Sequence, residues 1–272
     1  MRRPDIKTSR RRATAPGGFF MRALLLALAL ATVAPSRGHA ADCPNPNALG
    51  TSRVIEIDTR HGRFFGTKSY PETLPLGDHE IVLTFDDGPA GKTTDAVLEA
   101  LRKECVKATF FIVGDMAKAH PEQLKRIAAE GHTIGHHSMT HVIMTTVPFA
   151  RAKDDIAGGW HTVDRILYGE AHDRPRTPFF RFPGFAPTKE TAAWLSDLDV
   201  GVFGADFWGS DWMPMTAQQL LDQVLLRIET RRSGILLLHD IHAHTAAMVP
   251  ELLRELHRRG WKVVHIVPKG GA

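Results

Sequence analysis

Residues 80–89 read EIVLTFDDGP, an apolar run that ends in two carboxylates and a Gly-Pro turn. The run predicts a buried strand over Ile81–Phe85, which the turn prevents from continuing. Because consecutive residues leaving a strand point in different directions, Asp86 and Asp87 face different parts of one pocket. One carboxylate can then bind a cation while the other accepts a proton from water. Taken alone, the pattern also fits an Asp-Gly turn with two solvated acids.

Strand-like runs alternate with amphipathic helical patterns on the carboxyl side of this stretch. Further strands are predicted over residues 108–113, 133–134, 179–182, 200–205, 235–238 and 262–267. Helices are predicted over residues 94–105, 121–129, 153–167, 189–198, 217–231 and 245–259. About seven β/α units indicate an α/β fold with a parallel sheet, either closed as a barrel or open and doubly wound.

Polar residues directly follow apolar runs at five places in this pattern. In both architectures the carboxyl ends of parallel strands carry the functional groups, so these side chains are expected at one mouth. They are Asp86-Asp87, His136-His137, Arg181, Asp206 and His239-Asp240.

His137 and His141 are four residues apart, which on a helical turn places both imidazoles on one face. Two His and one carboxylate, with a position left for water, are typical of a catalytic zinc site. Such a His pair by itself more often has no metal, and His132 and His136 are expected to be structural.

Five short motifs between residues 80 and 267 together resemble those of the polysaccharide deacetylases of carbohydrate esterase family 4. The resemblance implies a (β/α) barrel, distorted or incomplete, with about seven parallel strands and an irregular N-terminal extension. The motifs are Asp86-Asp87, His137-Ser138-x-x-His141, Arg181-Phe182-Pro183-Gly184, Asp211-Trp212 and Leu237-Leu238-His239.

The resemblance also implies a role for each matching residue. It makes Asp87, His137 and His141 the ligands of Zn2+ or of another divalent ion such as Co2+ or Ni2+. It makes Asp86 the general base and His239 the general acid.

Further residues support this pair and the substrate in the resemblance. Arg181 would keep Asp86 ionised, and Asp211 would raise the pKa of His239, although Asp206 is an alternative partner on the same segment. A backbone N–H near residues 182–185 would stabilise the oxyanion. The predicted substrate-binding residues are Phe182, Pro183, Gly184, Trp212 and Leu237.

The first 40 residues have the order of a secretory signal peptide, with an Arg-rich start, a short apolar run and a small-residue cleavage site, and Met21 is an alternative start. Residues 41–78 are interpreted as an N-terminal extension, and residues 79–268 as the catalytic domain. We therefore expect an exported protein, periplasmic or secreted, without stable membrane insertion.

The basic charge belongs largely to the predicted leader. Residues 1–40 hold eight Lys/Arg and one Asp, so removing them takes the formal net charge from +4 to −3. This balance gives no support to nucleic-acid binding. An oxidising compartment permits Cys43 and Cys105 to form a disulfide, the alternative being a buried Cys105 thiol and a Cys43 in a mobile tail.

The sequence thus predicts a metal-dependent hydrolase that removes N-acetyl groups from an amino-sugar polysaccharide such as peptidoglycan, a chitin-like polymer or an exopolysaccharide. One alternative is the same fold acting on an O-acetyl ester or another C–N amide. Another is a non-catalytic glycan-binding protein. The sequence does not indicate an oligomeric state.

Overall fold

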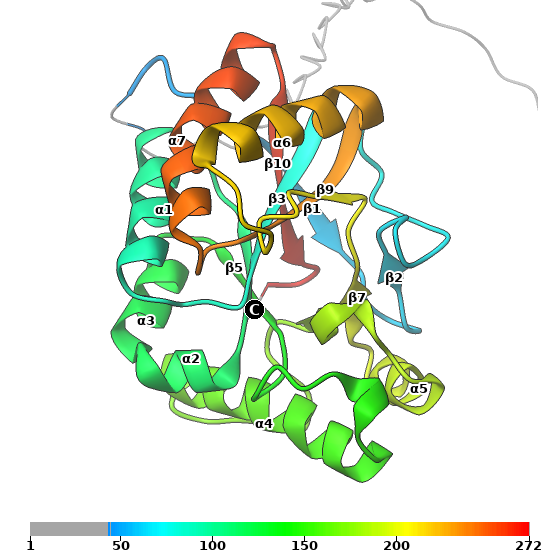
Figure 1. Cartoon of the computed structure of the whole chain (residues 1–272). Helices are drawn as coiled ribbons and strands as arrows, with labels where there is room; N and C mark the ends of the chain where they lie inside the picture. The colour runs from blue at the N-terminus through cyan, green and yellow to red at the C-terminus, as the bar shows by residue number, and fades with distance from the viewer. Residues whose placement is uncertain (1–42, 44, 272) are drawn as a thin grey trace, which may run out of the picture. The chain divides into compact units, whose positions relative to one another are not determined.

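The computed structural model of the protein describes residue 43 and residues 45–271 (Figure 1). The predicted signal peptide, residues 1–40, lies outside the described residues. The strands are β1 (Thr51–Ile57), β2 (Phe64–Phe65), β3 (Glu80–Asp86), β4 (Thr109–Ile112), β5 (Thr133–His136), β6 (Phe179–Phe180), β7 (Gly201–Phe203), β8 (Phe207–Trp208), β9 (Ser233–His239) and β10 (Lys262–Pro268). The helices are α1 (Lys92–Lys103), α2 (Gly114–Ala119), α3 (Pro121–Ala129), α4 (Phe149–Tyr168), α5 (Lys189–Asp197), α6 (Ala217–Arg231) and α7 (Ala243–Arg258), with short 3₁₀ turns at Met144–Thr146 and Pro183–Phe185.

The strands form one parallel sheet in the order β1-β10-β3-β4-β5-β6-β7-β2, with β9 pairing β3 and β8 pairing β9. β3 lies at its centre, because β9 pairs with its whole length while β10 and β4 meet its start and its end. The predicted α/β class is confirmed, and all seven predicted strands are present. The barrel is incomplete, since β1, β2 and β8 each pair with a single strand among the described residues.

The period of two along β3 decides which side chains enter the barrel. Ile81, Leu83 and Phe85 pack in the main hydrophobic cluster with residues of α1, α6 and α7, three helices that lie side by side in Figure 1. The alternate residues face the opposite side, so Thr84 and Asp86 point toward the interior. The Asp86 side chain therefore points into the barrel, away from the face of the sheet that the helices cover.

The helices begin where local chemistry predicts. α6 starts with a capping box, in which the Thr216 hydroxyl accepts from the Gln219 N–H and the Gln219 side chain accepts from the Thr216 N–H. α7 buries Val249, Leu252 and Leu256 against the sheet at helical spacing. None of the helices that the structure describes combines the length and apolar character needed to cross a bilayer.

The segment that we predicted as irregular contributes two strands that the sequence analysis did not predict. β1 pairs with β10 and β2 pairs with β7. β1 is an edge strand with mostly exposed side chains, so it lacks the continuous apolar pattern of the central strands. The structure also joins Cys43 to Cys105 in a disulfide, with 5.7 Å between the Cα atoms, which ties the start of this segment to the end of α1. The short elements α2 and β8 were missed because two to six residues carry no measurable period.

Candidate active site

Asp86 is held by a buried arginine that enters the barrel from the segment after β6. Arg181 donates from Nη1 to Asp86 Oδ1 at 2.6 Å and to Thr84 Oγ1 at 2.9 Å. Its other nitrogens donate to the carbonyls of Phe203 and Gly204. These contacts fix one carboxylate oxygen of Asp86 and leave Oδ2 facing the pocket, 3.8 Å from His137 Nε2.

Asp87, His137 and His141 form a group whose geometry suits a metal ion. Asp87 Oδ1 lies 3.4 Å from His137 Nε2 and 3.2 Å from His141 Nε2, and it is buried with no hydrogen-bond partner among the described residues. His137 Nδ1 contacts the Arg181 carbonyl at 2.7 Å. Because a carbonyl only accepts, Nδ1 carries the proton and Nε2 presents its lone pair to the group.

The donor set is chemically matched to a divalent transition metal. Burial raises the pKa of Asp87, but its interactions with the neighbouring imidazoles of His137, His141 and His239 outweigh burial and hold that pKa well below its ordinary value. An ionised carboxylate and two imidazole Nε2 atoms are three ligands of the kind that zinc takes in catalytic sites. The residues present therefore fit a catalytic metal, and they do not by themselves select zinc over cobalt or nickel.

The segment that carries the two histidines is a bend, so the predicted helical turn is wrong. Ser138 and His141 have positive φ values, 65° and 58°, which interrupt a right-handed helix. The rings nevertheless lie 5.0 Å apart, because Asp155 of α4 ties the bend together. Its carboxylate accepts from the N–H groups of Met139 and Thr140 and from the Thr140 hydroxyl at 2.7 to 3.1 Å.

His239, at the end of β9, is paired with Asp211. His239 Nδ1 lies 2.8 Å from Asp211 Oδ1, and Asp211 Oδ2 accepts from the His239 N–H and from the Thr245 hydroxyl. Burial lowers the pKa of His239, but the hydrogen bond to Asp211 and the charges of Asp211, Asp86 and Asp87 outweigh it and raise the pKa to about 9. Its Nε2 faces the metal group, 4.0 Å from Asp87 Oδ2.

Asp206 does not contact His239. Its carboxylate accepts from the hydroxyls of Thr67 and Thr73 and from the backbone N–H groups of Thr67 and Ile235. The structure therefore places Asp211, and not the alternative, beside the imidazole. The long-range contact of Asp206 with the N-terminal segment has no signal in the local sequence.

The predicted substrate-binding residues differ in their surroundings. Leu237 pairs in register with Thr84, so it shares the interior face of the sheet. Trp212 is exposed, with its ring 5.8 Å from that of His239. Gly184 is the exposed residue of a 3₁₀ turn and has φ 61°. The Phe182 side chain is 1% exposed and packs on Phe180, so only its backbone can face a substrate.

Pro183 is also buried. His132 and His136, the two histidines expected to be structural, are not members of the metal group. Burial lowers the pKa of both His132 and His136 to about 3, so both are neutral at physiological pH. Sequence reasoning missed Asp155, which supports the His141 bend, and Trp208, which contacts Trp212 and Phe185. A tryptophan next to a two-residue strand gives no motif by which it could be found.

Comparison with known proteins gives consistent matches. Residues 74–203 match the family model described as polysaccharide deacetylase. The chain is 27% identical over 245 residues to a peptidoglycan-N-acetylglucosamine deacetylase of Bacillus cereus, covering 88% of each chain. It is 27% identical to a peptidoglycan-N-acetylmuramic acid deacetylase of Bacillus subtilis, over 72% of this chain and 39% of that protein.

Among solved structures, a peptidoglycan deacetylase of Bdellovibrio bacteriovorus superimposes with a TM-score of 0.70 and 36% identity. The match covers 80% of this chain and 59% of that one, so the chain spans only part of some relatives. A family 4 carbohydrate esterase of Streptomyces lividans matches 71% of this chain with a TM-score of 0.60 and 26% identity. With the open parallel sheet, these matches show that residues 74–203 form a polysaccharide deacetylase domain similar to those of carbohydrate esterase family 4.

Proposed function

We propose that the protein is a metal-dependent hydrolase that removes N-acetyl groups from the amino sugars of a polysaccharide. The observation that carries the proposal is the placement of two proton-transfer groups beside one candidate metal group. Asp86 Oδ2 lies 3.8 Å from His137 Nε2, and His239 Nε2 lies 4.0 Å from Asp87 Oδ2. A glycan-binding protein without activity has no need of such a set.

Asp87, His137 and His141 would hold the ion, with Zn2+ as the expected metal and Co2+ or Ni2+ as alternatives. When bound, a divalent ion supplies Lewis-acid activation of a water molecule and of the acetamide carbonyl.

Asp86 is proposed as the general base. Arg181 occupies its Oδ1, so Oδ2 is the oxygen free to take a proton from the attacking water. As the water oxygen bonds to the carbonyl carbon, that proton moves to Asp86. Arg181 is a positioning residue in this step, because its contacts are to Asp86, Thr84 and backbone carbonyls.

His239 is proposed as the general acid. With a pKa of about 9 it is protonated at neutral pH, and Asp211 holds Nδ1 so that Nε2 faces the reacting group. When the C–N bond breaks, Nε2 gives its proton to the leaving amine, and the products are acetate and a free amino sugar.

The turn after Arg181 is the proposed oxyanion site. Pro183 has no N–H, and the Phe185 N–H donates to the Phe182 carbonyl at 3.0 Å. Within the turn, the N–H of Gly184 is therefore the proposed donor to the tetrahedral oxyanion. Leu237 and Trp212 would border the acetyl group from β9 and from the loop after β8.

The proposed substrate is an N-acetylated glycan of the cell envelope, in the periplasm or outside the cell. Relatives described as peptidoglycan deacetylases support this choice, and they include one named for N-acetylglucosamine and one named for N-acetylmuramic acid. Export by the predicted signal peptide belongs to the same proposal.

The test is acetate release by the purified protein from N-acetylglucosamine oligomers and from peptidoglycan fragments. Release should stop on chelation and return when zinc is restored. An O-acetylated glycan serves as the comparison substrate, and faster release from it would move the activity to an ester. His239→Ala should abolish turnover and leave the bound metal content unchanged; activity equal to wild type would refute the acid assignment. No release with one bound metal per chain would favour the glycan-binding alternative.

A further inference from the structure

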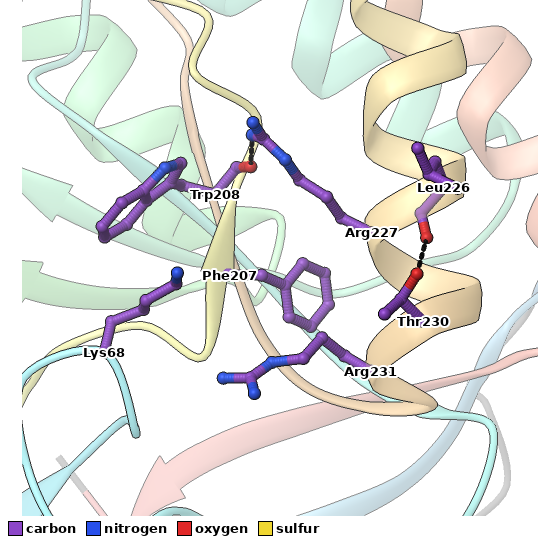
Figure 2. Close-up of a pocket in the computed structure, with 7 residues that line it drawn as sticks. All are labelled: Lys68, Phe207, Trp208, Leu226, Arg227, Thr230 and Arg231. Carbon is purple, nitrogen blue, oxygen red and sulfur yellow. Dashed lines mark hydrogen bonds between the residues drawn. The ribbon is translucent and has the colours of Figure 1, made fainter.

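A pocket of about 330 Å³ lies beside β8 and α6, outside the candidate active site. Three cationic side chains line it: Lys68, Arg227 and Arg231 (Figure 2). They extend around Phe207 and Trp208, which form β8. The pocket therefore combines an aromatic wall with positive charge, a combination that binds a sugar ring carrying an anionic group.

No carboxylate among the residues that the structure describes lies within salt-bridge distance of these three cations. Arg227 donates to the Trp208 carbonyl and to the Ser210 hydroxyl, and Arg231 donates to the Asp206 carbonyl. The side-chain ammonium of Lys68 lies 4.8 Å from the centre of the Trp208 ring. Arg231 also donates to the Thr67 hydroxyl, which in turn donates to the Asp206 carboxylate, so this acid lies one hydroxyl away from Arg231. Lys68 and Arg227 have only neutral partners, in a chain whose other surface arginines are mostly paired with acids.

A row of rings connects this pocket to the candidate active site. Trp208 lies 6.0 Å from Trp212, and Trp212 lies 5.8 Å from His239, between ring centres. Trp208 is thus shared by the pocket and the row, and two ring-to-ring steps separate it from the proposed acid. A glycan whose reacting sugar lies at His239 would carry its neighbouring sugar along this row, because sugars pack their apolar faces on exposed rings.

We propose that the pocket of Lys68, Arg227 and Arg231 is a subsite for a carboxylate carried by the glycan, and that it makes the protein prefer an anionic strand over a neutral one. This inference rests on the proposed function. It deepens that function by selecting peptidoglycan, whose muramic acid or stem peptide carries carboxylates, over a chitin-like polymer, which carries none.

Lys68→Glu is the decisive variant, because the Lys68 ammonium makes no side-chain hydrogen bond among the described contacts and its loss leaves the fold's polar network intact. The assay compares kcat/KM for acetate release from muramic-acid-containing tetrasaccharides and from the same fragments with their carboxyl groups reduced to alcohols. Wild type should prefer the carboxylate form, and Lys68→Glu should lower that preference roughly fivefold, since exposed charge pairs contribute up to about 1 kcal/mol.

Lys153→Glu is the matched control. Lys153 also lies over a tryptophan, with its ammonium 5.4 Å from the centre of the Trp194 ring. Replacing it with glutamate makes the same change of charge at a site outside the pocket. It should keep the wild-type preference, as should Lys68→Arg. An unchanged preference in Lys68→Glu, or an equal change in Lys153→Glu, would overturn the proposal.

Two further arms identify the carboxylate and separate the two proposals. Peptide-free strands expose the lactyl carboxylate of muramic acid. In peptide-bearing strands this carboxylate forms an amide, and only the carboxylates of the peptide remain. The carboxylate that the pocket binds belongs to the strand form whose kcat/KM is lowered by Lys68→Glu. If no fragment releases acetate, the proposed function fails. Equilibrium binding of the carboxylate and reduced fragments to wild type and Lys68→Glu then still decides the subsite, which is refuted if both proteins bind both fragments equally.

Discussion

The contact between Asp211 and His239 makes a prediction about pH. In the variant Asp211→Asn the imidazole keeps a neutral hydrogen-bond partner but loses the adjacent negative charge. The charge and hydrogen bond of Asp211 are the main contributions that raise the His239 pKa from 6.5 to about 9 against the effect of burial. Without them the pKa should fall to 6.5 or lower, a decrease of at least about two units, which corresponds to roughly 3 kcal/mol.

The expected consequence is a selective loss of activity at high pH. The protonated fraction of an acid falls tenfold for each pH unit above its pKa, so a decrease of two units should lower kcat/KM up to about a hundredfold above the wild-type alkaline limb and less than about twofold below the variant's own limb. The assay is acetate release from an N-acetylated glycan between pH 5 and 10 with saturating zinc. A bound cation lowers the His239 pKa in both proteins, so the displacement of the alkaline limb is the quantity to compare.

Asp206→Asn is the control for this experiment, because Asp206 is an equally buried acid on the same segment that contacts Thr67, Thr73 and Ile235 instead. Its alkaline limb should stay at the wild-type pH even if total activity changes. The reasoning is refuted if Asp211→Asn keeps the wild-type alkaline limb, or if both variants displace it equally.

Three other perturbations have outcomes that follow from single contacts. Asp155→Ala should weaken zinc binding about tenfold or more, because the bend that carries His141 loses its hydrogen bonds to the Asp155 carboxylate. Asp155→Asn should retain part of the affinity. Metal titration measures the zinc affinity of both variants, and affinities equal to that of wild type would contradict the role of Asp155 in holding the bend. Asp240→Asn should raise the melting temperature of the chelated protein at pH 8 and change it little near pH 4. Burial raises the pKa of Asp240 from 3.8 to about 7, so the folded protein favours the neutral carboxylic acid. The wild-type protein therefore loses stability as the pH rises from the unfolded-state pKa of 3.8 through the folded-state pKa of about 7. A difference in melting temperature that is the same at both pH values would oppose this account. Cys105→Ser should lower the free energy of unfolding by about 2 to 4 kcal/mol in a denaturant titration, since the disulfide closes a loop between residues 62 positions apart. Wild type treated with dithiothreitol is the control. If the variant loses no more unfolding free energy than the reduced wild type does, the disulfide is the cause.

The order of strands and helices was largely readable from the sequence. Central strands such as β3 are buried on both faces, and helices such as α6 repeat their apolar residues at helical spacing, so each has a strong local pattern. The bounds of α3 and α6 agree with those predicted. β1, β2 and β8 escaped prediction because they are short or lie at an edge, where partners distant in sequence supply the pairing.

The candidate site was also predictable as a set of residues, for a physical reason. Parallel strands end at one edge of the sheet, so polar residues after Phe85, Gly135 and Leu238 must approach one another wherever the helices pack. The sequence by itself therefore determined the α/β class and the groups available at the mouth.

Only the tertiary structure decided which of those groups touch. Asp206 and Asp211 are five positions apart and are the same residue type, yet the first contacts the N-terminal segment and the second contacts His239. His137 and His141 meet through a bend tied to Asp155, not through a helical turn. Lys68 and Arg231 line one pocket from distant parts of the chain. Local patterns encode periodicity and strand ends, whereas the choice among chemically equivalent partners depends on the packing of segments that the sequence places far apart.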